Sequence, residues 1–191
     1  DGKVFTIENN VVRPFPLKTL IKQRIYGILL DHKKNLWFAS YDGLLLLTPD
    51  GKEKLFTEKD GLPTLQLRSI LQDQKQNYWL GSRTHGIIKM EFKEFPHIPE
   101  FHRFQYNKMS ALDATFIMSI DEDTNGTFVV VSNTGGLAIV SPDSSIRSFS
   151  VKEGLSSNVT YSARTDKEGV VWIATSDGIG RLENGSIFNF S

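Results

Sequence analysis

A short pattern occurs four times along the chain, and this repetition constrains the fold more than any other feature of the sequence. Each copy begins with an aspartate and passes through a polar turn to an apolar residue and then a large one. A glycine follows six or seven residues later. The aspartates are Asp31, Asp73, Asp123 and Asp166, which are 42, 50 and 43 residues apart. The large position holds Trp37, Trp79, Val129 and Trp172, and the glycines are Gly43, Gly86, Gly136 and Gly178.

Each repeat predicts four short strands. In the first repeat these cover residues 24–30, 36–40 and 44–48 and the surroundings of Phe56, and they are rich in β-branched and aromatic residues between Asp, Asn and Gly turns. The turn signals recur too often to leave a helical window of about ten residues. A period of this length with four strands is typical of a β-propeller blade. The sequence therefore predicts an all-β protein of about four four-stranded antiparallel blades plus part of another, as a segment of a larger propeller.

We expect one β-propeller segment over residues 1–191. Residues 1–23 are expected to form the outer strands of a preceding blade, and the blades that follow are expected at 24–65, 66–115, 116–158 and 159–191. The second blade carries an insert at 94–113, whose aromatic residues are Phe95, Phe101, Phe104 and Tyr106. These aromatic side chains either pack against the blade or present a surface to a ligand or partner.

The repeated residues have structural explanations. A tryptophan supplies a large wedge between neighbouring blades, and the glycine after it permits the positive φ of a tight hairpin. The aspartate accepts hydrogen bonds from backbone N–H groups two or three residues on. Because each blade has its own aspartate, the four do not form a metal or acid site. The residue four before each aspartate is small, which suits an innermost strand near a crowded axis: Gly27, Ser69, Ser119 and Ser162.

Composition excludes several classes of function. Lys plus Arg and Asp plus Glu are both 22, so the net charge is zero, which argues against nucleic-acid or membrane-surface binding. The chain has no cysteine, which excludes disulfides, thiolate catalysis and cysteine-ligated zinc. No apolar run has the roughly 20 residues that a spanning helix needs. The spacing of His97, Glu100 and His102 matches no specific metal site. We expect no cofactor and no metal.

Longer stretches of the repeats resemble a known family. Asn35-Leu-Trp-Phe-Ala-Ser-Tyr-Asp-Gly-Leu44, Tyr78-Trp-Leu-Gly-Ser82 and Val171-Trp-Ile-Ala-Thr-Ser-Asp-Gly-Ile179 resemble the two-component regulator propeller repeat. The link Phe56-Thr-Glu-Lys-Asp-Gly-Leu-Pro63 fits the same pattern, and Phe149-Ser-Val-Lys-Glu-Gly-Leu-Ser156 parallels it without gaps. The third copy departs from the pattern, because Val129 stands where the tryptophan is expected.

The resemblance implies a sensor region of the kind found in Bacteroidetes hybrid two-component histidine kinases. Such a region is periplasmic, as the extracytoplasmic part of an inner-membrane protein, and many of these sensors control polysaccharide use. The segment would bind a glycan-derived ligand, relay to a kinase outside this chain and have no enzyme activity of its own. Its partners would be an oligosaccharide and either neighbouring blades of the parent propeller or a second copy. The alternatives are a lyase or hydrolase similar to streptogramin lyases, or a protein-interaction scaffold without a small ligand.

The candidate ligand residues lie in the turns that follow the tryptophan strands. In a propeller these turns share one face with the links between blades, and they offer aromatic, carboxylate, amide and guanidinium groups suited to a sugar. The candidates are Tyr41, Asp42, Arg83, His85, Asn133 and Asp177. His85 is the one histidine among them, which weakens the enzyme interpretation.

Overall fold

The computed structural model describes residues 2–96, 98–104 and 116–190, together with the side chains of all these residues except 98 and 104. Nearly all regular structure in them is strand. A hairpin at the N-terminus consists of β1 (Phe5–Glu8) and β2 (Val11–Pro14). The first blade contains β3 (Ile25–Leu30), β4 (Leu36–Ser40), β5 (Gly43–Leu47) and β6 (Glu53–Phe56). The second contains β7 (Leu67–Gln72), β8 (Tyr78–Ser82), β9 (Ile87–Glu94) and β10 (Ile98–Phe104).

The remaining two blades repeat this order. The third contains β11 (Ile117–Glu122), β12 (Phe128–Ser132), β13 (Gly136–Val140) and β14 (Ile146–Phe149). The fourth contains β15 (Thr160–Thr165), β16 (Val171–Thr175), β17 (Gly178–Glu183) and β18 (Ser186–Phe190). Two short 3₁₀ turns, η1 (Glu58–Asp60) and η2 (Val151–Glu153), lie in the links between blades.

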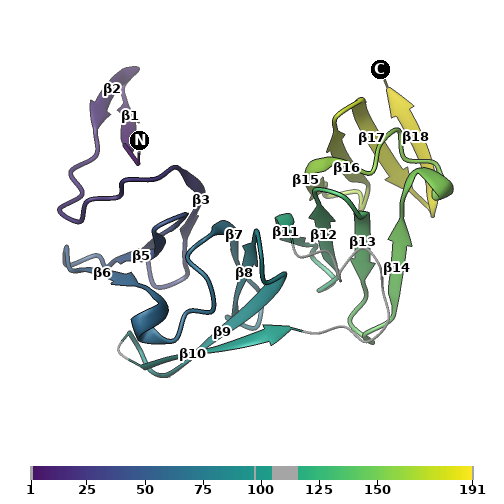
Figure 1. Ribbon diagram of the computed structural model, residues 1–191. Coiled ribbons are helices and arrows are strands. Elements are labelled where there is room, and N and C mark those ends of the chain that lie inside the picture. The colour runs from purple at the N-terminus through teal and green to yellow at the C-terminus, as the bar shows by residue number, and fades with distance from the viewer. Residues whose placement is uncertain (1, 97, 105–115, 191) are drawn as a thin grey trace.

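The sheets of the four blades are all antiparallel, and in each the strands follow chain order from the innermost to the outermost. This confirms the predicted all-β propeller blades. The blades succeed one another around an axis, and Figure 1 shows an arc that is open between the N-terminal hairpin and the fourth blade. The innermost strands β3, β7, β11 and β15 are neighbours in that order.

Close approach of the innermost strands explains the small residue four positions before each aspartate. A Cβ added at Gly27 would lie 3.3 Å from both the Cα of Ser69 and the backbone nitrogen of Ile70. Ser119 also receives a hydrogen bond across a blade boundary, from the backbone nitrogen of Ala163 at 3.3 Å. The expectation of a crowded inner strand is therefore confirmed at these positions.

Neighbouring blades pack through one recurring pair of residues. The side chain five after an aspartate lies against the side chain six after the aspartate of the preceding blade. Tyr78 and Trp37 have ring centroids 5.1 Å apart, and Phe128 and Trp79 have centroids 5.2 Å apart. At the third boundary Val171 and Val129 share one buried cluster. A hollow of about 170 Å³ lies at this boundary and is lined by both valines, so the smaller pair leaves space that the aromatic pairs fill elsewhere.

The aspartate turns also bind the tryptophans. Oδ1 of Asp31 accepts hydrogen bonds from the backbone nitrogens of Lys33 and Asn35 at 2.9 and 2.8 Å, and Oδ2 accepts from Nε1 of Trp37 at 2.9 Å. The backbone donors are two and four residues on, rather than two or three. Trp79 and Trp172 donate in the same way to their own aspartates. In the described part of the chain no three His, Asp or Glu side chains are grouped to hold a metal.

The described part of the predicted insert belongs to the second blade. β10 pairs antiparallel with β9 along its length. The side chains of Phe95 and Phe101 pack against the core cluster shared by the first two blades. For these two aromatic residues the packing interpretation is confirmed. The side chain of Phe104 and residues 105–113, including Tyr106, lie outside the described part.

Candidate functional site

The turns after the tryptophan strands share a face with the links between blades, as expected. The backbone nitrogen of Arg83 donates to Gln66 at 2.9 Å, that of Asn133 to Phe116 at 3.0 Å, and that of Ser176 to Val159 at 3.0 Å. In each pair the acceptor precedes the innermost strand of the same blade. Each turn is thereby fixed to the beginning of its blade.

All four innermost strands contain a bulge at the same repeat position. The register skips one residue between the first and third residues of each strand. The skipped residue is five before the aspartate: Tyr26, Arg68, Met118 and Tyr161. A bulge redirects a side chain out of the regular alternation of a strand, and bulges are frequent beside binding sites.

Two of these bulged residues belong to a cluster of alternating aromatic and guanidinium groups, which we call the Arg68 cluster: Tyr26, Tyr41, Arg68, Arg83 and Phe116. The guanidinium carbon of Arg68 lies 4.1 Å from the ring centroid of Tyr26 and 4.9 Å from that of Phe116. The ring of Tyr41 lies 4.6 Å from that of Tyr26. The guanidinium carbon of Arg83 lies 5.5 Å from the same Phe116 centroid. Residues from both of the first two blades and the start of the third therefore meet here.

The guanidinium and phenol donors of the cluster have no acceptor in the described part of the chain. Among the residues that the structure describes, neither guanidinium has a hydrogen-bond or ion-pair partner, and Nε of Arg68 is buried without one. The phenol groups of Tyr26 and Tyr41 likewise make no hydrogen bond within that part of the chain. Stacking between rings holds the Arg68 side chain in place. Such a site suits a ligand that supplies oxygen acceptors.

The structure brings two of the six sequence candidates, Tyr41 and Arg83, into this cluster. The other four have local contacts. Asp42 Oδ2 accepts from the backbone nitrogens of residues 22 and 23 at 2.6 and 2.9 Å, which ties the turn to the chain before β3. Nδ1 of His85 lies 2.9 Å from Oγ1 of its neighbour Thr84.

Asn133 and Asp177 lie in the turns of the third and fourth blades. The backbone nitrogen of Asn133 donates to the carbonyl of Phe116, which itself belongs to the Arg68 cluster. Asp177 Oδ1 accepts from Ser176 Oγ at 2.8 Å. No contact in the described part of the chain joins Asp177 to the cluster.

Sequence reasoning missed Tyr26, Arg68 and Phe116. Tyr26 and Arg68 occupy one repeat position, directly before the small residue of the innermost strand. A comparison of that position across the four repeats, which shows tyrosine, arginine, methionine and tyrosine, was the available signal. Phe116 has no such repeat pattern.

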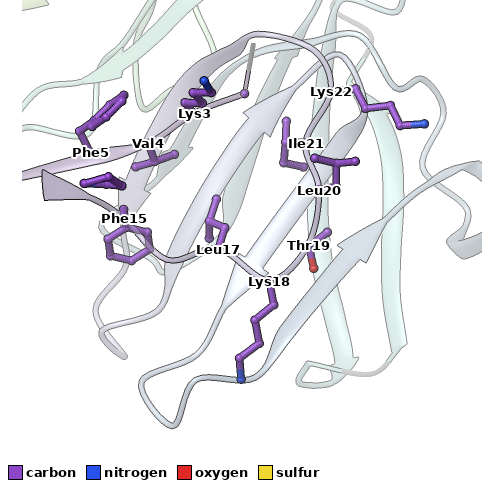
Figure 2. A pocket seen from close by; sticks show the side chains of 12 residues that line it. Lys3, Val4, Phe5, Phe15, Leu17, Lys18, Thr19, Leu20, Ile21 and Lys22 are labelled. Atoms are coloured by element: carbon purple, nitrogen blue, oxygen red, sulfur yellow. The ribbon is translucent and has the colours of Figure 1, made fainter.

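Apart from the Arg68 cluster, a hollow lies at the N-terminal end of the arc. It has a volume of about 710 Å³ and is lined by residues 2–5, 14–15 and 17–22. Figure 2 shows the apolar side chains of Val4, Phe15 and Leu17 around it, with Lys18 and Lys22 at its margin. The strand β1 pairs with β2 on one side only, whereas the third strand of each complete blade pairs on both sides. The hollow therefore adjoins a hairpin whose strand β1 has one partner strand in the described part of the chain.

No helix in the described part of the chain has the length and apolar character required to cross a membrane. The only helical segments in that part are the two short 3₁₀ turns η1 and η2.

The comparison with known families confirms the resemblance to the two-component regulator repeat. Residues 154–177, from the link before the fourth blade to its tryptophan turn, match the family described as "Two component regulator propeller". No curated protein matches the sequence.

Solved structures with similar folds include two sensor domains and a lyase. The extracellular domains of the putative hybrid two component systems BT3049 and BT4673 from B. thetaiotaomicron superpose with TM-scores of 0.78 and 0.73. They are 23% and 20% identical over 97% and 88% of this chain. Virginiamycin B lyase from Staphylococcus aureus superposes with a TM-score of 0.74 at 13% identity over the whole chain.

At these identities the likeness defines the fold, a β-propeller. The chain spans 25% of each sensor domain and 63% of the lyase.

Proposed function

We propose that this chain is the ligand-binding propeller segment of a hybrid two-component sensor, located on the extracytoplasmic side of the membrane. The observation that carries the proposal is the combination of the family match at 154–177 with an unsatisfied donor cluster on the turn face. Neighbours of similar fold include extracellular domains of such systems, which agrees with this location.

A glycan-derived ligand fits the chemistry of the Arg68 cluster. Guanidinium and phenol groups donate hydrogen bonds to sugar oxygens, and aromatic rings contact the C–H faces of sugar rings. Binding would draw together residues of the first three blades. Because those blades share buried aromatic contacts, a shift at the cluster would be transmitted through packed side chains to a kinase outside this chain.

The lyase alternative has a distinct requirement. A lyase needs groups that remove and donate protons at the reacting bond. On the turn face, His85 is the candidate residue that could transfer a proton, and its ring contacts Thr84. We propose that the segment has no catalytic activity; turnover of a streptogramin by the purified chain, abolished in H85A, would refute this.

The decisive experiment is a binding screen of the purified 191-residue chain against a panel of neutral and acidic oligosaccharides by isothermal titration calorimetry. We expect saturable binding of at least one member. The variant F116A, which removes the ring shared by both guanidinium groups, is expected to weaken it. Absence of binding across the panel, with the chain folded by circular dichroism, would contradict the proposal.

We further propose that the outer face of the fourth blade packs against another blade of the same repeat type. Trp172 is 41% exposed, whereas its equivalent Trp37 is fully buried by the second blade. Ile179, Phe188 and Phe190 extend the same apolar face and are each about half exposed. A following blade would place its residue five after the aspartate on Trp172, as Tyr78 and Phe128 do at the earlier boundaries.

The absence of native cysteine allows a direct test of this packing. In the variant I179C, we expect thiol labelling to slow when a copy of residues 66–115 is appended after Ser191. The same extension should leave labelling of a V12C variant, on the N-terminal hairpin, unchanged. Equal labelling of I179C with and without the extension would overturn the packing proposal, and slower labelling of both variants would indicate association of copies instead.

A further inference from the structure

We infer that the Arg68 cluster recognises an anionic saccharide, with a carboxylate or sulfate of the sugar paired to Arg68 and Arg83. This inference rests on the proposed function, because it specifies the class of glycan that the sensor segment binds. The residues that carry it come from the bulge of β7, the turn after β8 and the residue before β11.

Arg68 and Arg83 lack a counter-charge in the described part of the chain. Two arginines elsewhere in the described chain pair with acids: Arg164 with Asp121 at 3.7 Å, and Arg181 with Glu183. Arg68 and Arg83 have no such partner among the described residues. The nearest carboxylate in the turns that contribute to the cluster, Asp42, is already bonded to two backbone N–H groups. No described residue therefore neutralises the positive charge of the cluster, and we infer that a ligand does so.

The two guanidinium groups of the cluster lie close to each other. Both guanidinium groups contact the ring of Phe116, at 4.9 and 5.5 Å from its centroid. They are consequently no farther apart than the length of a disaccharide. Like charges held at this range repel each other, and an anion between them or beside either one relieves the repulsion. Guanidinium groups also match the planar geometry of a carboxylate with two parallel hydrogen bonds.

The side chain of Arg68 is held between aromatic rings. Its guanidinium carbon lies 4.1 Å from the Tyr26 centroid, 5.7 Å from the Tyr41 centroid and 4.9 Å from the Phe116 centroid. A side chain fixed between rings loses little freedom when it binds, so more of the interaction appears as affinity. The two phenol groups beside it make no hydrogen bond within the described chain and can donate to hydroxyl or ring oxygens of the same sugar.

The test compares trisaccharides that carry a carboxylate, a neutral ester or a sulfate. Calorimetry of the 191-residue chain would use trigalacturonate, the methyl ester of the same trisaccharide, and a sulfated galactose trisaccharide. We expect trigalacturonate to bind at least tenfold more tightly than its ester, with affinity falling as salt rises. Preference for the sulfated sugar over both would support the anionic class and identify sulfate as the recognised group.

Variants locate the site. R68Q and R83Q are each expected to reduce the affinity for the acidic sugar at least tenfold while changing the affinity for the ester little. R13Q removes an equal charge from the exposed strand β2 and is expected to leave binding unchanged. If R68Q does not fold, the exposed R83Q carries the test. Equal binding of the acid, the ester and the sulfated sugar would overturn this inference and leave the proposed function standing; binding of no saccharide would overturn both.

Discussion

The hydrogen bond between Tyr78 and Asp31 is expected to account for a measurable share of stability, because it joins two blades through a buried charge. The Tyr78 hydroxyl donates to Oδ2 of Asp31 at 2.7 Å. Asp31 is 3% exposed and Tyr78 is 5% exposed. Burial disfavours the charged carboxylate, yet hydrogen bonds from Asn35, Trp37 and Tyr78 outweigh it, so the pKa of Asp31 lies below its ordinary value.

The substitution Y78F removes this one interaction and retains the ring. The contacts of that ring with Trp37 and Phe92, at centroid distances of 5.1 and 6.0 Å, are preserved. A hydrogen bond to a charged group contributes about 1.5–3 kcal/mol. For a chain of this size, 1 kcal/mol corresponds to roughly 2–4 °C in Tm. We therefore expect Y78F to lower the Tm by about 4–8 °C for a loss of about 2 kcal/mol.

The pH dependence of the difference provides an internal check. A carboxyl group with a lowered pKa in the folded state stabilises the protein above its unfolded pKa, and this stabilisation is lost as the pH falls through the folded pKa. The pKa of Tyr78 is raised, first by burial and then by Asp31, so its hydroxyl remains protonated in the folded state at neutral pH. The cost of Y78F should accordingly be largest near neutral pH and shrink as Asp31 is protonated in acid.

Urea unfolding followed by tryptophan fluorescence at pH 7 and at several acidic values would measure both quantities. The control is Y161F, since Tyr161 occupies an inner strand but is 48% exposed, and we expect it to change the free energy of unfolding by less than about 0.5 kcal/mol. A Y78F variant as stable as Y161F, or a cost that does not decline in acid, would refute the account of the Asp31 network.

Two further pairs of variants test the blade architecture. G136A is expected to destabilise the protein by more than about 2 kcal/mol, because φ is +74° and a Cβ would overlap the Phe149 carbonyl oxygen; G51A, at φ +80° with no atom within 4 Å, should cost about 1 kcal/mol in urea unfolding. Equal costs would show that backbone conformation alone matters at Gly136. W37A should cost about 3–5 kcal/mol, and W172A about half of that because Trp172 is 41% exposed; similar values from thermal melting would indicate that the outer face of the fourth blade is already covered in solution.

Much of the fold was predictable because the repeat marks its own strands. The predicted segments 36–40 and 44–48 correspond to Leu36–Ser40 and Gly43–Leu47. Each is bounded by an aspartate turn or a glycine with positive φ, and these local signals do not depend on distant contacts. The contact of Tyr78 with Asp31 was not predictable, since its partners are 47 residues apart and meet only when two blades stack.

The candidate site was predictable only in its turns. Tyr41 and Arg83 follow tryptophan strands, where the shared face of a propeller exposes side chains. Tyr26 and Arg68 lie within strands, and the alternation of side chains assigns such residues to one blade face or the other. The bulge in each innermost strand breaks that alternation at these two positions. The residue type at one position does not reveal a bulge when a single repeat is considered.

Comparison of the four repeats distinguishes the residues that pack between blades from the bulged residue of each innermost strand, whose side-chain type differs from repeat to repeat. At the blade boundaries, residues change in matched pairs: aromatic side chains face aromatic ones at two boundaries, and valine faces valine at the third. The bulged position has no matching partner of this kind, and it changes from tyrosine to arginine to methionine and back to tyrosine along the chain. Met118 packs against the buried cluster of the third and fourth blades, whereas Tyr26 and Arg68 contact the turn face. At these two positions, substitutions can alter what the turn face binds without altering the matched pairs between blades. The guanidinium of Arg68 lies at such a bulge, where it contacts the ring of Tyr41 in the turn of the first blade as well as the rings of Tyr26 and Phe116.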